Sequence, residues 1–198
     1  MTEEATFQKS SSESASATIV PQRSERAEWY VLRVTYQREL VAQRMLNDLG
    51  VRNFVPTIKV RRRKSGGRFY WREEAKVHNY IFAYASLAEL QEIKTTKITF
   101  LRYMMGKGES GRPEPQWVPE QQMEDFMAVC RSEGAQYLDA DVPFHKGDRV
   151  RILGGPLKGV EGIYTKTTLK HEKRVVVRIE GVAAVATVAM PADAVEKI

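Results

Sequence analysis

The spacing of apolar residues from position 28 onward switches between the period of a strand and that of a helix. Residues 29–35 alternate as a strand does. The apolar residues that follow share one helical face, with Gly50 placed to end the helix: Ala42, Met45, Leu46 and Leu49. The pattern therefore predicts a strand followed by a helix.

The next segment predicts a strand that leads into a hairpin arm. FVPTIKV at 54–60 is β-prone, and Pro56 favours an edge position or a bulge, because proline cannot donate to a strand ladder. A basic stretch at 61–64 runs into the turn sequence Ser65-Gly66-Gly67, and the chain returns through an aromatic stretch at 68–72.

Two further strands and two helices complete this region. β-prone runs at 79–84 and 98–105 predict the strands, with a short helix between them because Ser86 and Glu89 have the spacing of a capping box. Residues 107–117 have the composition of a loop. Pro119 fits the first turn of a last helix, closed by Gly134, with apolar residues at helical spacing: Met123, Phe126, Met127 and Cys130.

This order of elements predicts an α+β domain over residues 28–132. Strand, helix, strand with arm, strand, helix, strand and helix is the split βαβ pattern of a ferredoxin-like sheet, with helices over one face. Residues 1–27 are rich in Ser, Thr, Glu and Ala and predict a disordered tail. Residues 133–142 lack periodicity and predict a linker.

Residues 143–198 predict a separate small all-β barrel of five strands. Short β-branched runs at 174–179, 182–190 and 195–198 are separated by glycine and proline. They follow the stretch KGDRVRILGGPLKGVEGIYTK at 146–166, whose pattern resembles the KOW motif, the first hairpin of a Tudor-like barrel. The residues that carry this resemblance are Gly147, Asp148, Val150, Gly155, Pro156, Gly159 and Gly162.

Composition favours a basic cytoplasmic protein without a cofactor. The net charge of +6 and the pI near 9.4 indicate attraction to a polyanion. The one cysteine, Cys130, cannot form an intramolecular disulfide, and the three histidines lack metal-ligand spacing, so we expect no metal. No apolar run is long enough to span a membrane.

Nothing in the sequence predicts an enzyme. Glu73 with Glu74, and Asp139 with Asp141, are neighbouring acids in loops, where charges are usually solvated. No paired base, nucleophile or metal site accompanies them. An acylphosphatase-like enzyme on the same scaffold is thus disfavoured.

The order of motifs after the tail resembles the NusG family of transcription elongation factors. The segments that carry the resemblance are WYVL at 29–32, Glu39, the basic arm, NYIF at 79–82, FLRYMMG at 100–106, PEQQMEDF at 119–126 and the terminal barrel. The resemblance implies a non-catalytic, monomeric protein. It also implies that the first domain binds the clamp helices of the RNA polymerase β′ subunit, and that the KOW domain binds a second partner, such as a small-subunit ribosomal protein.

The resemblance also implies an apolar polymerase-binding pocket. The matching positions are Val77, Tyr80, Phe82, Tyr103 and Met104. The alternative is that these aromatic and sulfur-containing side chains are simply core residues. Many family members have Pro-Gly before the tyrosine, where this chain has His78-Asn79, so the geometry of this turn is open.

The basic arm is a candidate contact to DNA of the elongation complex. Clustered cations release counterions from phosphates, and aromatics stack on exposed bases. The cations are Arg61, Arg62, Arg63, Lys64 and Arg68. The alternative is a solvated hairpin. The resemblance adds Tyr36 and Arg38, at the junction of the first strand and helix, as contacts to the non-template strand.

Three departures predict a specialised paralogue that antiterminates long operons, such as those for surface polysaccharides. They are the Ser-rich tail, His78-Asn79, and Glu180, where many members carry an aromatic that packs on Rho or on a small-subunit ribosomal protein. A carboxylate cannot fill that apolar socket without desolvation, so we expect weak or no Rho binding. The alternative function is a KOW-containing ribosomal or RNA-binding structural protein, which would co-purify with ribosomal particles rather than with polymerase.

Overall fold

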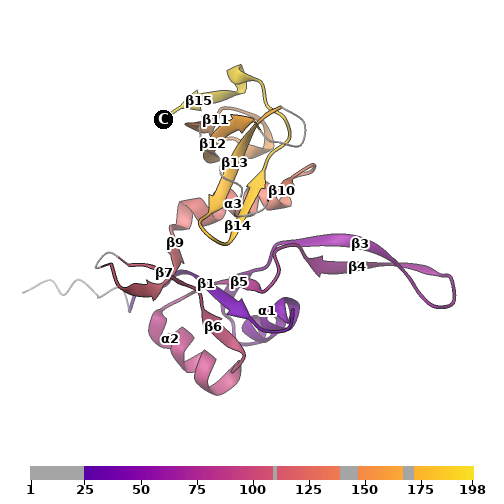
Figure 1. Ribbon diagram of the computed structural model, residues 1–198, viewed down its shortest axis with the longest axis vertical. Helices are drawn as coiled ribbons and strands as arrows, with labels where there is room; N and C mark the ends of the chain where they lie inside the picture. Colours follow the sequence, from indigo (N-terminus) through magenta and orange to yellow (C-terminus); the bar gives the residue numbers. More distant parts are fainter. Residues whose placement is uncertain (1–24, 109–110, 139–146, 167–171) are drawn as a thin grey trace, which may run out of the picture.

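The fold contains two β-rich parts with a long helix between them (Figure 1). The structure, a computed structural model, describes residues 25–108, 111–138, 147–166 and 172–198. The first part is built on an antiparallel sheet with the strand order β2-β5-β1-β6. Its strands are β1 (Glu28–Val34), β2 (Arg52–Phe54), β5 (Tyr80–Ala85) and β6 (Leu101–Tyr103), and β9 (Trp117–Val118) also pairs with β1.

One face of this sheet is covered by α1 (Glu39–Asp48) and α2 (Leu87–Glu92). Ser86 begins α2 as predicted, since its hydroxyl accepts a hydrogen bond from the Glu89 N–H at 3.2 Å. A π-helical turn, η1 (Ile93–Lys97), extends α2. The core between helices and sheet includes Tyr30, Leu32, Ala42, Leu46, Ile81, Ala83 and Leu90.

The opposite face of the sheet packs on α3 (Glu120–Arg131). Trp29, Val31 and Phe82 project from the sheet, and Met123 and Phe126 project from the helix. The prediction that the helices cover one face is therefore wrong for α3. The amphipathic pattern of a helix shows that one side is buried, but it does not show which face of a sheet receives it.

Two predicted strands are interrupted where the backbone changes partner. The strand predicted at 54–60 is divided between two observed strands. β2 ends at Phe54, and β3 (Thr57–Arg63) begins after Pro56, which has no N–H to continue the ladder. The strand predicted at 98–105 ends as β6 at Tyr103. β7 (Met105–Lys107) then pairs with β8 (Pro113–Pro115), so part of the predicted loop at 107–117 forms strands.

The arm is a two-stranded ribbon of β3 and β4 (Phe69–Ala75) that projects away from the rest of the fold (Figure 1). Its turn contains Gly67 at a φ of 81°, a conformation that costs glycine little.

The C-terminal part is a six-stranded sheet in the order β10-β14-β13-β12-β11-β15. Its strands are β10 (Gln136–Leu138), β11 (Asp148–Ile152), β12 (Glu161–Lys166), β13 (Lys173–Ile179), β14 (Ala183–Ala186) and β15 (Val195–Lys197). Short 3-10 turns lie at η2 (Gly155–Leu157) and η3 (Ala192–Ala194).

The extra strand comes from the segment that was predicted as a linker. Residues 136–138 pair with Ala184 to Ala186 at the edge of β14, so the sheet contains one strand more than the five predicted. Three residues are too few to display a period of two along the sequence. The rest of that segment from position 139, and the predicted tail up to position 24, lie outside the described residues.

Among the helices of the described residues, none combines the length and the apolar composition of a membrane span.

Candidate functional site

The turn before β5 takes the geometry that a glycine would allow, although an asparagine occupies it. Asn79 has a φ of 67°, in the left-handed region that asparagine tolerates better than most residues. Its N–H donates to the carboxylate of Glu39, which is only 2% exposed, and its carbonyl accepts from the Val34 N–H at 2.9 Å. The substitution of His78-Asn79 for Pro-Gly therefore leaves a well-formed turn in place.

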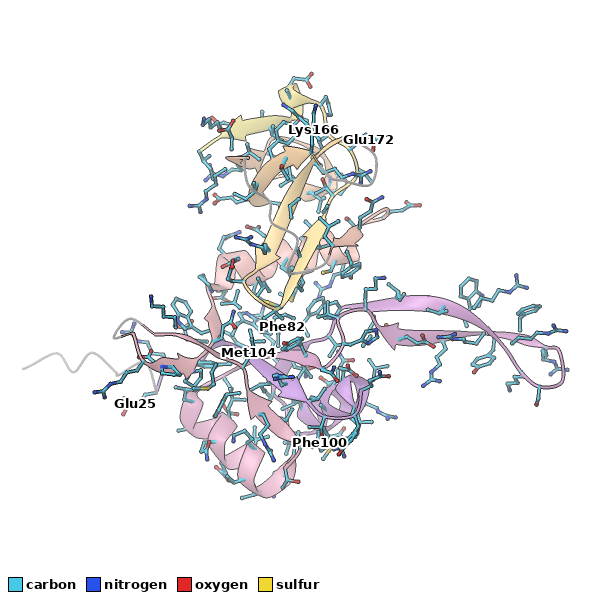
Figure 2. The ribbon with its side chains drawn as sticks, in the orientation of Figure 1. Glu25, Phe82, Phe100, Met104, Lys166 and Glu172 are labelled. Atoms are coloured by element: carbon cyan, nitrogen blue, oxygen red, sulfur yellow. The ribbon has the colours of Figure 1, made fainter. Side chains whose placement is uncertain are left out.

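Four of the five predicted pocket residues belong to one apolar cluster. Phe82 is fully buried, and Val77, Tyr80 and Met104 pack against the same cluster while remaining half-buried. The Tyr80 hydroxyl lies 4.0 Å from the Met104 sulfur. In Figure 2, Phe82 and Met104 lie between the first sheet and the turn that joins β13 to β14.

The fifth residue, Tyr103, lies on the other side of the sheet. It packs in the core formed with α1 and α2, and its hydroxyl donates to the Leu87 carbonyl at 3.4 Å. Adjacent residues of a strand point to opposite faces, so Tyr103 and Met104 are separated by the sheet. The structure therefore does not bring Tyr103 together with the other four.

The C-terminal sheet packs over the face that carries this cluster. Side-chain amides of Gln116 and Gln122 donate to the carbonyls of Glu180 and Arg178, at 2.8 and 2.7 Å respectively. Glu180 thus lies in the contact through its backbone, while its side chain is 78% exposed and pairs with Arg178 at 3.0 Å. A groove beside this contact is lined by Met104, Gln116, Trp117, Glu180 and Gly181, among others.

A buried carboxylate lies in the same contact. Asp125 on α3 is 5% exposed and accepts from the Glu161 N–H at 3.2 Å and from the Gln121 amide at 3.1 Å. Burial raises the pKa of Asp125, and these two hydrogen bonds only partly oppose the rise. Gln121, Gln122 and Asp125 are polar residues of α3, and Gln116 lies just before β9, so the apolar periodicity carried no signal of these contacts.

The cations of the arm have unequal surroundings. The Arg61 guanidinium lies over the Phe69 ring at 4.1 Å and the Lys64 ammonium lies 5.6 Å from the Tyr70 ring. Arg62 forms a bidentate pair with Glu74, and the hydrogen bond from Arg62 lowers the pKa of that carboxyl. Arg63 and Arg68 are exposed near the turn of the arm.

The junction between β1 and α1 displays an aromatic ring on an unusual backbone. Tyr36 and Gln37 have φ values of 58° and 52°, and the Tyr36 side chain is 88% exposed. The Arg38 guanidinium donates to the carbonyl and the hydroxyl of Thr35 and lies 4.0 Å from the Phe100 ring. Arg38 therefore braces this turn, and Tyr36 is the residue that the junction presents to solvent.

The predicted motif glycines occupy two kinds of position. Gly155 and Gly159 have φ values of 76° and 90°, which other residues rarely adopt. A Cβ on Gly147 would lie 2.8 Å from the Tyr164 carbonyl oxygen, and one on Gly162 would lie 2.7 Å from the Val176 carbonyl oxygen. Val150 is buried, Asp148 pairs with Lys197 at 2.7 Å, and Pro156 lies in η2.

The described residues contain no cluster of three or more His, Cys, Asp or Glu side chains that could hold a metal ion. Burial raises the pKa of the Cys130 thiol to about 12. The thiol is therefore protonated at neutral pH and is a poor nucleophile.

Comparison with known proteins gives a match to a family profile and matches to solved structures, one of which is described below. The sequence profile described as "Transcription termination factor nusG" matches residues 27–127, about half of the chain. Among curated protein sequences, none matches significantly. A solved structure described as "Domain interaction in Thermotoga maritima NusG" is similar at 20% identity and a TM-score of 0.43, covering 88% of this chain and 99% of that one.

Proposed function

This chain belongs to the NusG family, and we propose that it binds the clamp helices of the RNA polymerase β′ subunit and promotes processive elongation. Membership of the family makes it a transcription factor; the clamp contact, the DNA contact and the target operons are proposals. We expect it to act by binding alone, without a catalytic step, as a monomer in the cytoplasm.

Two features of the topology support the proposed architecture. The sheet order β2-β5-β1-β6 is the order expected of a ferredoxin-like split βαβ unit. In the C-terminal sheet, the glycines that resemble a KOW motif lie around β11 and β12. Strands β13, β14 and β15 bring the number to five, and β10 is added at one edge. We propose that these five strands are the KOW barrel.

The observation that carries the polymerase proposal is the apolar cluster around Phe82. An apolar helix-binding surface needs neighbouring apolar side chains on one face. Such a group is formed by Val77, Tyr80, Phe82 and Met104. Because the C-terminal sheet packs over the same cluster, we propose that the clamp helices and the C-terminal sheet exclude each other. Tyr103 is left out of the proposed contact, since it faces α1 and α2.

Substitution of Tyr80 tests the polymerase proposal. Tyr80→Ala should weaken binding to polymerase by about 1 to 3 kcal/mol, as truncation of an aromatic anchor does. Tyr70→Ala on the arm is a matched control, because Tyr70 is exposed and remote from the cluster. Equal affinity of the wild type and Tyr80→Ala in a titration with purified polymerase would refute the proposed site.

We also propose that the arm contacts DNA of the elongation complex. Replacement of Arg61, Arg62, Arg63 and Lys64 by Gln should reduce crosslinks to upstream DNA and flatten the salt dependence of binding, because phosphate contacts set that slope. If crosslinks and slope are both unaltered, the arm is a solvated surface.

Finally, we propose a specialised role in long operons, with weak or no Rho binding. The exposed carboxylate of Glu180 supports this, because an apolar socket would have to desolvate it. Calorimetry should detect little binding of the wild type to Rho and some binding of Glu180→Phe; a tight wild-type complex would overturn the argument. Occupancy across the genome should peak on few operons, and coverage of most genes would indicate a general factor.

A further inference from the structure

The two faces of the arm carry different side chains. Residues that lie opposite each other in an antiparallel ribbon share a face, and here Arg61 is paired with Trp71, and Arg62 with Tyr70. We define the aromatic face by the residues Lys59, Arg61, Arg63, Phe69 and Trp71. The opposite face carries Arg62, Tyr70, Arg72 and Glu74.

The aromatic face is open to solvent. Phe69 and Trp71 are 52% and 69% exposed, which is unusual for rings of this size. The Arg61 and Arg63 guanidinium groups lie 4.1 and 5.9 Å from the centre of the Phe69 ring, so positive charge and exposed rings alternate along this face. The acid that shares the face, Glu73, accepts a hydrogen bond from the Thr57 hydroxyl at 2.6 Å, near the base of the arm.

The opposite face is less available. Arg62 donates two hydrogen bonds to Glu74, at 2.8 and 2.6 Å, so part of its charge is already compensated. Arg62, Arg72 and Glu74 also line a hollow together with residues of α1 such as Leu40. The one ring on the opposite face, Tyr70, is the least exposed of the three arm rings, at 38%.

We propose that the aromatic face binds single-stranded DNA, with unpaired bases stacked on Phe69 and Trp71 and phosphates paired with Lys59, Arg61 and Arg63. The choice of DNA rests on the proposed function, which brings the arm to the DNA of an elongation complex. The exposed rings favour a single strand, because unpaired bases have free faces that can stack on them.

Exposed rings recognise unpaired bases because stacking needs a free base face. In a duplex the base faces are stacked on each other, and only phosphates and groove edges are accessible. Phe69 and Trp71 are two positions apart on one strand, so their Cα atoms are separated by about 7 Å. This is about twice the 3.4 Å rise between stacked bases, so one base fits between the two rings.

Charge argues for a nucleic acid rather than an apolar protein surface. An apolar partner would have to desolvate three cations beside the rings, and the one acid on the face is already hydrogen-bonded to Thr57. A phosphate backbone compensates these cations while the bases cover the rings.

Fluorescence anisotropy of the full-length protein with labelled oligonucleotides tests the inference. The probes are a single-stranded DNA of about 15 nucleotides, the duplex and the RNA of the same sequence. The double variant Phe69→Ala/Trp71→Ala should bind the DNA strand about ten- to a hundredfold more weakly, since each stacked base contributes substantially. Tyr70→Ala, on the opposite face, should change the affinity by less than about threefold.

Tryptophan fluorescence provides a second measurement. Trp29 is 1% exposed and Trp117 is half-buried, so quenching by the DNA strand should come mainly from Trp71. Trp71→Phe should keep most of the affinity, because a ring remains, and should lose the quenching. All of these arm side chains are exposed, so the variants should unfold at the wild-type temperature.

Four results would overturn the inference. They are an unchanged affinity of the double variant, an equal loss in Tyr70→Ala, tighter binding of the duplex or the RNA than of the DNA strand, and no oligonucleotide binding at all. Because polymerase is absent from these assays, each result is independent of the clamp contact. Failure of Tyr80→Ala to weaken polymerase binding would refute the proposed function and leave the oligonucleotide result intact.

Discussion

Gly162 is a residue at which one added methyl group should disturb the C-terminal sheet. A Cβ there would meet the Val176 carbonyl oxygen and a Val175 methyl group, both at 2.7 Å. Gly162→Ala should lower the free energy of unfolding by about 1 to 3 kcal/mol, the usual range for overpacking. Urea denaturation followed by circular dichroism measures this difference.

Gly154→Ala is the matched control. Gly154 has extended backbone at a φ of −153°, and a Cβ there would meet nothing within 4 Å. Its substitution should leave the midpoint of unfolding nearly unchanged. If both variants lose the same free energy of unfolding, the loss does not come from the close approach of β12 and β13 at Gly162.

Asp125 should make the stability of the fold depend on pH. Its pKa is raised in the folded state by burial, so the folded state binds the proton more tightly than the unfolded chain does. The resulting stabilisation is complete below the unfolded pKa of about 3.9 and is lost as the pH rises through the folded pKa. At neutral pH this carboxylate therefore opposes folding.

Asp125→Asn should remove this dependence. The side-chain carbonyl of asparagine still accepts from the Glu161 N–H, and no charge has to be buried. The stability of the variant relative to wild type should increase between pH 4 and pH 7, as measured by urea denaturation at each pH. A variant that is less stable by a constant amount across this range would show that the interface requires the charge.

Single positions were predicted well where the strand period is regular. Val150 and Ile152 are both 2% exposed, as the alternation with Arg149 and Arg151 predicts. The prediction that Leu49 lies on the buried face of the helix was wrong. Leu49 is 43% exposed and lies one residue past the end of α1. Glu39 and Asn79 could not be paired from the sequence, since they are 40 residues apart and neither carries a motif for the other.

Among the secondary-structure elements, α2 offers a direct test of capping. The Ser86 hydroxyl accepts from the Glu89 N–H, one of the amides that the first turn of a helix leaves unpaired. Ser86→Ala should destabilise the fold by about 1 kcal/mol in thermal or urea unfolding. Ser65→Ala is the control, because Ser65 lies in the exposed turn of the arm; a loss of the same size there would refute the role of the cap.

Elements were predicted from the sequence where they are long and periodic. β1, α1, β5, α3 and β13 lie close to their expected positions. The short strands β7, β8 and β10 were missed, since three residues carry no measurable period. Both faces of β1 are buried, so its pattern could not show which face receives α3.

The packing of the two β-rich parts against each other should respond to the loss of two amides. Gln116 and Gln122 each donate to a backbone carbonyl of β13 or of the turn after it, and each bond contributes about 0.5 to 1.5 kcal/mol. The double variant Gln116→Ala/Gln122→Ala should therefore show faster hydrogen exchange in α3 and should bind polymerase more tightly.

Gln91→Ala on α2 is the control, since Gln91 is exposed and remote from the contact. If the double variant exchanges faster but binds polymerase with unchanged affinity, the C-terminal sheet does not compete with the clamp helices. If neither quantity changes, apolar packing alone holds the two parts together.

The packing of the two parts was not predicted from the sequence. Each part has its own regular pattern, and a pattern along the chain reports which residues are buried but not what buries them. Residues from both parts, such as Phe82 and Val177, belong to one apolar cluster.

The position of α3 between two partners has a consequence for how this chain can diverge. Most surface helices are constrained on one side only, whereas α3 packs on the first sheet and also contacts β13 and β14. Its exposed positions form a narrow stripe: Glu120, Gln121, Glu124 and Arg131. Inherited substitutions should therefore accumulate in this stripe, while a change elsewhere in α3 must suit two neighbours at once and should spread only together with a compensating change in the other part.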